Sequence, residues 1–289
     1  MTKPSLSDYG TYDESTVPRL WDGVVGAWCP SLGPTGTRLH DFSRYGNWGT
    51  LTNMDPATDW VVDGGQYALD FDGVNDYSDF GANIALGGLQ QLTIAAWVWR
   101  ATAGQLLAIS RYDNSQGAEA TADYFGTNNI TANGQVAFLA ATKGNTIDYI
   151  LFHSTETMTA GAWNFIAASV LINGASSTAQ LFLNGSLCTF NDASSVTKPT
   201  SWSTNNATTY KTARIVGTSG VPAYNSGRVG DMMAWNRRLA AAEIRGLYLL
   251  GRGGMFQRRR VRRGYVSEAA AVRSYLFVNR GQVIGGGTL

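Results

Sequence analysis

Short apolar runs separated by turn-forming residues dominate the chain from Trp21 onward. The runs have the length of strands, and the pairs Asp72-Gly73, Asn133-Gly134 and Asn184-Gly185 stand between them. Such pairs tolerate the positive φ angles that tight hairpin turns require. The pattern therefore predicts antiparallel strands joined by hairpins. The expected strands are 24–28, 67–71, 92–99, 105–111, 135–141, 148–153, 163–172, 179–184, 212–217 and 228–235.

Two of these runs, 92–99 and 163–172, contain almost no polar positions, so we expect them to lie centrally in a sheet. A helix is predicted only over 239–250, where apolar residues recur near helical spacing and Gly251 provides a C-terminal stop. Charged residues make up only 15% of the chain, which is low for a protein that relies on salt-bridged helices. The fold class expected is therefore all-β.

The expected domain organisation is one sandwich between two arms. The sandwich spans 21–250, which suits the size of a single β domain. Residues 1–20 are polar and show neither the helical nor the strand period, so they are expected to form an N-terminal arm. Residues 251–289 form an Arg-rich C-terminal arm, in which 274–287 alternates enough to add one strand.

Charge is divided unevenly along the chain. Residues 1–236 hold 11 Lys and Arg against 19 Asp and Glu, a net charge of −8, whereas 237–289 hold 11 Arg against two Glu, a net charge of +9. No apolar run is long enough to span a membrane, and the polar first residues lack the apolar core of a secretory signal. Two Cys and two His provide neither a disulfide framework nor a poly-His metal site.

Seven motifs follow one another in a fixed order: GVVGAWCP, HDFSRYGNWGTL, YALDFDGVNDYSDFG, LTIAAWVWR, AGAWNFIAASVLI, AQLFLNGSL and RVGDMMAWNRRLAAAEIRGLYLLG. This series resembles the concanavalin A-like jelly rolls of the laminin G type, in particular their microbial branch. The resemblance covers about residues 22–250. It implies an antiparallel jelly-roll β-sandwich with one short C-terminal helix, a fold that carries many functions.

Some jelly rolls of this superfamily are retaining glucanases, whose E-x-D-x-E strand supplies two carboxylates roughly 5 Å apart. None of the five Glu shares a predicted strand with a second carboxylate at that spacing. The nearest pair, Asp70 and Asp72, lies in the FDG turn, where a side chain that caps the turn is the simpler role. Neither His40 nor His153 lies near a G-x-S-x-G elbow. We therefore expect no enzymatic activity.

The resemblance also implies calcium as a candidate ion at the rim of the sandwich. Asp72, Asn75 and Asp76 offer oxygen ligands from one turn, which suits Ca²⁺. The alternative is that these side chains cap their own hairpin through hydrogen bonds to its backbone. In that case the protein needs no cofactor.

Glycan binding requires an exposed aromatic ring near amides and carboxylates. Trp48, Trp202 and Tyr224 fall in predicted loops or at strand ends, so they are the candidates for contact with a glycan or a cell surface. The alternative for a loop Trp is that it fills the edge of the sandwich. Trp97 and Trp163 lie inside predicted strands and are expected in the core.

The segment RGGMFQRRRVRR at 252–263 is the most basic part of the chain. Nucleic acid is not the expected partner, because no Lys, aromatic series or nucleic-acid-binding fold accompanies the arginines. A solvated charged run is one alternative. Docking on an acidic partner, including a second copy of the chain, fits the charge asymmetry better. The candidate docking residues are Arg258, Arg259, Arg260, Arg262 and Arg263.

The sequence is compatible with two functions. The first is a non-enzymatic structural or adhesive protein on the surface of a phage virion, as head decoration, head fibre or tail-associated component. Such a protein would be assembled in the host cytoplasm, dock through its arms on other copies or on capsid or tail proteins, and display a lectin-like sandwich. The resemblance supports this, because related jelly rolls occur in phage genomes. The alternative is a carbohydrate- or host-surface-binding module, with cell-surface glycans as ligands and no particle role.

Overall fold

The computed structural model describes residues 20–82, 84–113, 121–128, 133–142, 145–202, 209–216, 222–254, 278–279 and 282–283. The chain divides into two compact units, 1–257 and 258–289. In the second unit, β20 (Val278–Asn279) pairs with β21 (Gln282–Val283). The described part of 274–287 therefore contains a short antiparallel pair in place of the single strand that we expected.

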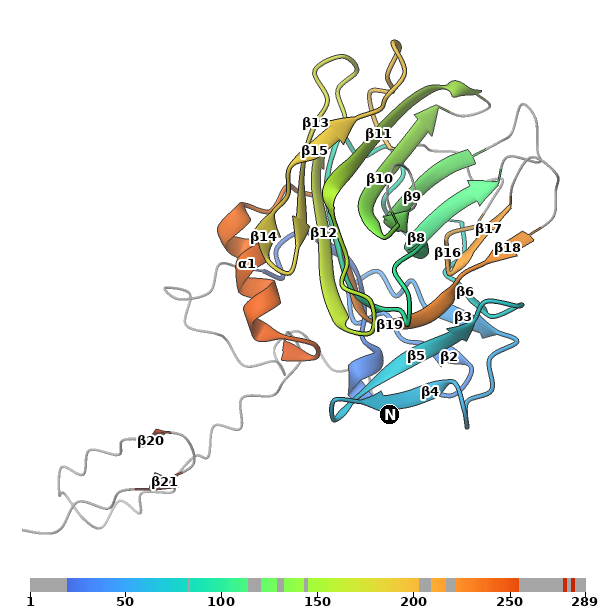
Figure 1. Cartoon of the computed structure of the whole chain (residues 1–289), viewed down its shortest axis with the longest axis vertical. Coiled ribbons are helices and arrows are strands. Elements are labelled where there is room, and N and C mark those ends of the chain that lie inside the picture. Colours follow the sequence, from blue (N-terminus) through green and yellow to red (C-terminus); the bar gives the residue numbers. More distant parts are fainter. Residues whose placement is uncertain are drawn as a thin grey trace, which may run out of the picture. The chain divides into compact units, whose positions relative to one another are not determined.

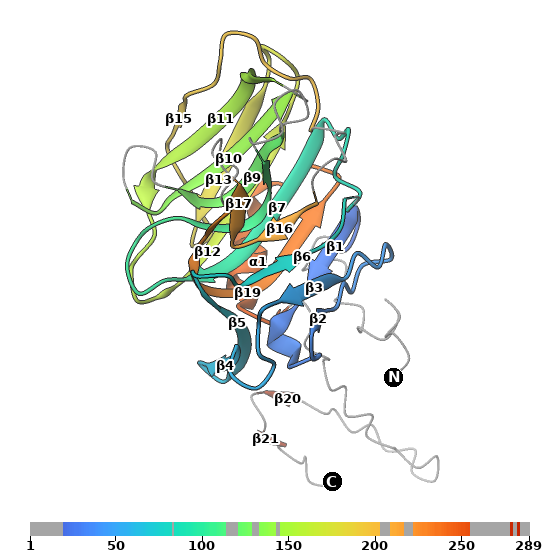
Figure 2. The same ribbon diagram turned by 90° about the vertical axis from the view of Figure 1, so that its right-hand side faces the viewer.

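The first unit contains two antiparallel sheets that form a sandwich, shown in two views in Figures 1 and 2. The predicted all-β jelly-roll class is thus confirmed. In the described residues the first sheet has eight strands. In spatial order they are β14 (Ser186–Leu187), β13 (Thr178–Leu183), β12 (Trp163–Leu171), β7 (Gln91–Trp99), β19 (Ser226–Trp235), β5 (Gln66–Asp72) and β4 (Trp60–Asp63), with β1 (Val24–Trp28) also paired to β19.

The second sheet is the larger of the two. As described, its strands are β15 (Phe190–Asp192), β11 (Asn145–Thr157), β10 (Gln135–Thr142), β9 (Thr121–Asn128), β8 (Leu106–Asp113), β16 (Lys211–Thr212), β6 (Tyr77–Asp79), β3 (Gly49–Thr52) and β2 (Arg38–Leu39). Two further strands, β17 (Arg214–Val216) and β18 (Pro222–Tyr224), pair with each other, and β17 also pairs with β8. A short 3₁₀ turn, η2 (Pro30–Leu32), follows β1.

The central strands β7 and β12 bury both faces, which explains their lack of polar residues. On one face Ile94 and Ile166 join the core between the two sheets. On the other face Ala95 and Ala167 join a second core under helix α1 (Ala241–Leu250). Figure 1 shows α1 on the outer side of the first sheet. The central position predicted for both runs is therefore confirmed, since β12 and β7 lie between β13 and β19.

The predicted strands all occur, with ends shifted by a few residues. The run expected over 212–217 is split into β16 and β17 by Ala213, whose φ of 61° breaks the extended conformation. The helix begins at Ala241 because Ala240 has an extended backbone (ψ 157°) and its N–H donates to the Glu243 carboxylate (2.8 Å), which caps the first turn. The sequence did not reveal β2, β3, β4, β6, β9, β14, β15 or β18. No helix among the described residues is long and apolar enough to cross a membrane.

The sandwich does not end at residue 250 as expected. Residues 251–254, which we call the strap, pack on its surface: Arg252 lies with its guanidinium carbon 3.8 Å from the centre of the Trp163 ring. The N–H of Gly253 donates to the carboxylate of Asp231, and burial raises the pKa of that carboxyl. The Gln66 amide donates to the carbonyl of Arg252. The strap therefore supplies hydrogen-bond and ring partners to the sandwich, and it lies in the same compact unit, 1–257.

A buried ion pair links β8 and β9 in the interior of the sandwich. Arg111 and Asp123 lie 2.7 Å apart with fully buried side chains. The guanidinium carbon of Arg111 is 4.5 Å from the centre of the Tyr210 ring, and the indole N–H of Trp202 donates to the Tyr210 hydroxyl (2.8 Å). Trp202 also packs on Phe138 and is completely buried. The prediction that Trp202 contacts a glycan is therefore wrong, because its loop folds the indole into the core.

Removing one partner of this ion pair should destabilise the protein strongly. Asp123→Asn leaves the buried Arg111 charge without a counterion, so we expect a loss of about 3–5 kcal/mol in the free energy of unfolding. The double variant Arg111→Met/Asp123→Leu should recover most of that loss. Urea unfolding measures each variant. The exposed pair Lys198–Asp192 (2.6 Å) provides the control, since Asp192→Asn should cost below about 1 kcal/mol. A cost of Asp123→Asn as small as that of the control would contradict the expectation.

The strap leads to a second prediction, which replaces the expectation that Trp163 belongs to the core. Trp163 is half-buried, as is Trp97, so Trp163→Ala should leave the sandwich folded. Losing the ring beneath Arg252 should lower the free energy of unfolding by roughly 1–2 kcal/mol. It should also speed trypsin cleavage after Arg252, which mass spectrometry measures over time. Trp48→Ala, which removes another ring near an arginine, should leave that cleavage rate unchanged. Equal rates for Trp163→Ala and the native chain would show that the strap is not held by this contact.

Candidate functional site

Three side chains of the larger sheet form a group that we call the rim cluster: Tyr77 of β6, Arg214 of β17 and Tyr224 of β18. The Arg214 guanidinium carbon lies 4.9 Å from the centre of the Tyr77 ring and 6.0 Å from that of Tyr224. The two tyrosine rings are 6.1 Å apart and tilted by 38°. All three residues are half-buried, so the cluster is open to solvent on part of its surface.

Backbone hydrogen bonds hold the rim cluster in place. The N–H of Ala213 donates to the carbonyl of Leu107 in β8 (2.9 Å), and the N–H of Asn225 donates to the carbonyl of Ala213 (2.8 Å). Arg214 and Tyr224 are opposite each other in the β17–β18 ladder. Because β16 pairs with β6, the residue that follows the kink at Ala213 comes to lie beside Tyr77. These strands lie together at the right of Figure 1.

Arg214 differs from the neighbouring cations in its electrostatic environment. Within the described segments it forms no ion pair, and its Nε is buried without a hydrogen-bond partner. By contrast, Arg228 pairs with Asp63 (2.8 Å) and Asp70 (3.1 Å), and Lys211 lies 3.6 Å from Asp79. The guanidinium of Arg214 therefore has hydrogen-bond donors that no described side chain uses.

A chain of amides adjoins the rim cluster. The Asn225 amide donates to the Gln105 side chain (3.2 Å), and the Gln105 amide donates to the Asn128 side chain (3.0 Å). The Asn128 amide in turn contacts the Tyr124 hydroxyl. Asn225 directly follows Tyr224 in the chain, and its own side chain is buried. Amide groups and aromatic rings can together bind sugar hydroxyls and the apolar faces of a sugar ring.

Sequence reasoning found Tyr224 but missed its two partners. Tyr77 stood in the motif YALDFDGVNDYSDFG, and Arg214 stood in a predicted strand. Neither signal indicated that the two residues meet, because the pairings of β6 with β16 and of β17 with β18 are long-range properties. The candidate docking residues Arg258, Arg259, Arg260, Arg262 and Arg263 lie outside the described residues.

The candidate metal ligands form a self-contained turn. The Asp72 carboxylate accepts N–H bonds from Val74 (2.7 Å), Asn75 (3.2 Å) and Asp76 (3.4 Å), while Asp76 accepts from the N–H of Asp72 (3.1 Å). Burial opposes ionisation of Asp72, but the three N–H donors outweigh it and lower its pKa. Burial and the Asp72 charge raise the pKa of Asp76. Among the described residues no three His, Cys, Asp or Glu side chains converge as metal ligands. The geometry matches the capping alternative.

Trp48 is exposed, with 40% of its surface accessible. His40 stacks on its ring at 4.6 Å with an interplanar angle of 16°, and the Arg38 guanidinium carbon lies 5.6 Å from the ring centre. The stacked imidazole covers one face of the indole. Trp48 is thus available at the surface, and its ring contacts, which are with His40 and Arg38, do not join it to the rim cluster.

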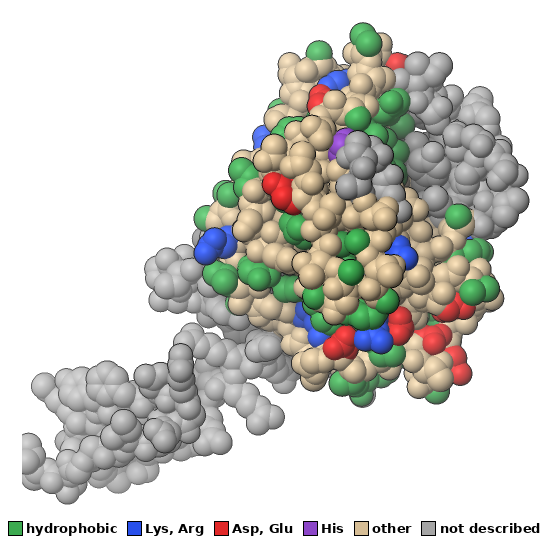
Figure 3. Space-filling view, viewed as in Figure 1, with side chains coloured by type: hydrophobic (Ala, Val, Ile, Leu, Met, Phe, Trp, Pro, Cys, Tyr) green, Lys and Arg blue, Asp and Glu red, His purple; other side chains and the backbone are tan. Residues whose placement is uncertain are grey.

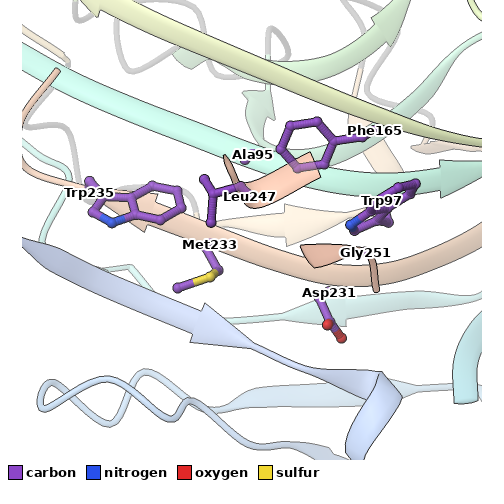
Figure 4. A pocket seen from close by; sticks show the side chains of 8 residues that line it. All are labelled: Ala95, Trp97, Phe165, Asp231, Met233, Trp235, Leu247 and Gly251. Carbon is purple, nitrogen blue, oxygen red and sulfur yellow. The ribbon is translucent and has the colours of Figure 1, made fainter. Parts of the chain in front are cut away.

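A small pocket lies between α1 and the outer face of the first sheet (Figure 4). Its volume is about 20 Å³, close to that of a single water site. The lining is mostly apolar and consists of Ala95, Trp97, Phe165, Asp231, Met233, Trp235, Leu247 and Gly251. The space is a packing gap under the helix and is too small for a sugar ring.

The family model described as "Concanavalin A-like lectin/glucanases superfamily" matches residues 72–245, more than half of the chain. The chain belongs to this superfamily. The resemblance inferred from the seven motifs is thereby confirmed. No curated protein sequence matches the chain.

Several solved structures share the superfamily fold with this chain. The receptor binding domain of botulinum neurotoxin mosaic serotype C/D superposes with a TM-score of 0.52 at 13% identity, covering 80% of this chain and 51% of that one. Trypanosoma rangeli sialidase in complex with sialic acid gives a TM-score of 0.50 at 15% identity, covering 79% and 33%. Domain 4 of an extracellular arabinanase from Geobacillus stearothermophilus, in complex with arabinotriose, gives 0.48 at 12% identity, covering 78% and 98%. The chain spans half the length of the neurotoxin domain and a third of the sialidase. At these identities the likeness concerns the fold alone.

The superfamily includes both lectins and glucanases, so the side chains of the larger sheet bear on which of these two functions the chain could have. A cluster of buried apolar side chains separate from the sandwich core lies on β8 to β10: Leu107, Tyr124, Ala137, Leu139 and Ala141. A retaining glucanase needs two adjacent carboxylates. The pair weighed from the sequence is engaged elsewhere, since Asp70 pairs with Arg228 and Asp72 caps its turn.

Calcium should leave the stability of the protein nearly unchanged. Backbone N–H groups already occupy the Asp72 carboxylate, so chelation with EDTA should shift Tm by less than about 3 °C, or ~1 kcal/mol at this size. Asp72→Ala should lower Tm equally in calcium and in EDTA. The pKa of Asp72 in the folded protein lies below its usual value of 3.8, so the ionised carboxylate stabilises the fold fully above that pH. The destabilisation caused by Asp72→Ala should therefore be largest above pH 3.8 and disappear as the pH falls through the folded pKa. A drop in Tm of more than about 10 °C on chelation would instead establish a metal site.

Proposed function

We propose that the chain is a non-enzymatic adhesive protein that displays its lectin-like sandwich on the surface of a phage virion. It would serve as head decoration, head fibre or tail-associated component. The sandwich would contact glycans through the rim cluster, and the terminal arms would dock on other copies or on capsid or tail proteins. The rim cluster, a half-exposed arginine between two tyrosines beside a chain of amides, is the observation that carries the binding role.

The binding role is further supported by relatives of the same fold. The neurotoxin domain is a receptor binding domain, and the sialidase was solved with sialic acid. The superfamily description itself names lectins. Membership of such a superfamily makes a surface-binding function a natural use of the scaffold, although function depends on the site itself.

The docking role is supported by charge and by the strap. Residues 45–99 contain seven Asp and neither Lys nor Arg, whereas the arm after residue 254 carries the dense arginine run. Figure 3 shows acidic side chains gathered toward the lower right of the view, in the region of β3 to β6. Through Arg252 and Gly253 the strap holds on the sandwich the residues that come shortly before the arginine run in the sequence. An acidic body joined to a basic arm suits attachment between copies.

Truncation tests the docking role. A chain ending at Gln257 keeps the strap, so we expect it to fold with an unchanged Tm and to lose self-association or attachment to particles. A chain ending at Leu250 loses the strap and should melt earlier. Replacing Arg258, Arg259, Arg260, Arg262 and Arg263 by Gln should make attachment weaker and less sensitive to salt. Assembly of the Gln257 chain at the native level would contradict the docking role.

Two measurements separate the virion protein from the second candidate, a glycan-binding module without a particle role. A fixed number of copies in purified virions of the encoding phage supports the first. Absence from virions, together with retention of the chain on a glycan array, supports the second. Failure in both experiments would overturn both candidates.

A further inference from the structure

We propose that the rim cluster binds a saccharide that carries a carboxylate, with Arg214 as the residue that recognises the acid group. This inference rests on the proposed glycan-binding role and specifies the class of its ligand. Its basis is the juxtaposition of an arginine that lacks a counterion with two tyrosine rings and an amide chain.

The first step of the argument is the unsatisfied guanidinium. Buried donors in folded proteins almost always have an acceptor, because a lost hydrogen bond to water must be replaced. In the described part of the chain the Nε of Arg214 has no acceptor, which is also true of the Nε of Arg111. Arg214 differs in forming no ion pair there, whereas Arg111, Arg228 and Arg237 each pair with a carboxylate. An acceptor brought by a ligand would complete the site.

The second step is the charge of Arg214 itself, which pairs with no carboxylate among the described residues. The aspartates on the neighbouring strand and turn are already engaged: Asp72 accepts three backbone N–H bonds, and Asp79 lies 3.6 Å from Lys211 and accepts from the Thr209 hydroxyl (2.7 Å). Arg214 is thus the cation of the rim cluster that no described carboxylate neutralises. A carboxylate is the group whose two oxygens match the planar guanidinium fork.

The third step identifies the rest of the ligand as a sugar. The rings of Tyr77 and Tyr224, 6.1 Å apart, flank the guanidinium and provide apolar surfaces that suit the C–H face of a sugar ring. Asn225, which follows Tyr224, is buried and donates to the half-buried Gln105, whose amide nitrogen donates one N–H to Asn128 and keeps a second that suits a sugar hydroxyl. A small free carboxylate would use only the arginine. A sugar ring that carries a carboxylate, as in uronic or sialic acids, uses all three kinds of group.

Binding of the full chain to matched saccharides tests the proposal. The probes are a panel of uronic- and sialic-acid oligosaccharides, the same oligosaccharides with the carboxyl reduced to an alcohol, and sulfated neutral oligosaccharides, each measured by calorimetry. We expect the acidic probe that binds best to bind at least about tenfold more weakly after reduction, as for loss of a charge-assisted hydrogen bond. Arg214→Gln should weaken the acidic probe by a similar factor and leave Tm nearly unchanged. Arg214→Lys should recover only part of the affinity, because it keeps the charge and loses the fork.

Arg44→Gln is the matched control, since Arg44 also lies over a tyrosine, with its guanidinium carbon 5.1 Å from the Tyr45 ring. It should bind the acidic probe like the native chain. If the acidic and the reduced probes bind equally well, and Tyr224→Ala weakens the binding of both, the carboxylate inference is overturned and the glycan-binding role remains intact. Preference for the sulfated probes would likewise overturn it. Absence of binding to every probe and to a glycan array would overturn both.

Discussion

The fold depends on a sheet that is apolar on both faces. Strands β7 and β12 place Ile94 and Ile166 on one face and Ala95 and Ala167 on the other, so neither face can remain in water. The second sheet covers one face and helix α1 covers the other. The order of layers, the position of the helix after the last long strand and the two separate cores all follow from this requirement.

Buried polar groups then fix the segments that apolar packing alone does not hold. The Arg111–Asp123 pair and Tyr210 provide a polar contact within the core for the indole N–H of Trp202, and so they draw the loop of Trp202 inward. Asp231 plays a similar role on the outer face, where its carboxylate requires the N–H of Gly253. In both places an ionisable group buried by the strands selects the position of a connecting segment.

The rim cluster arises from one backbone irregularity. The positive φ of Ala213 ends β16 and redirects the chain, so Arg214 pairs with Tyr224 and lies against Tyr77. The hairpin of β17 and β18 thus brings together the three side chains of the proposed binding site. The division between a rigid sandwich and a variable rim is what allows one fold to support lectins, receptor binding domains and enzymes.

The sequence by itself determined the fold class, the central position of β7 and β12, the late helix and the superfamily, because periodicity and turn residues report local conformation and burial. It missed the eight-residue β9 and several short strands such as β3 and β6. The few residues of the short strands leave no period to detect. The sequence also misplaced Trp202 and Trp163 and did not connect Tyr77 with Arg214. Those outcomes depend on which strands pair and which buried group requires a partner. Such long-range contacts exist only in the tertiary structure, so only the tertiary structure could decide them.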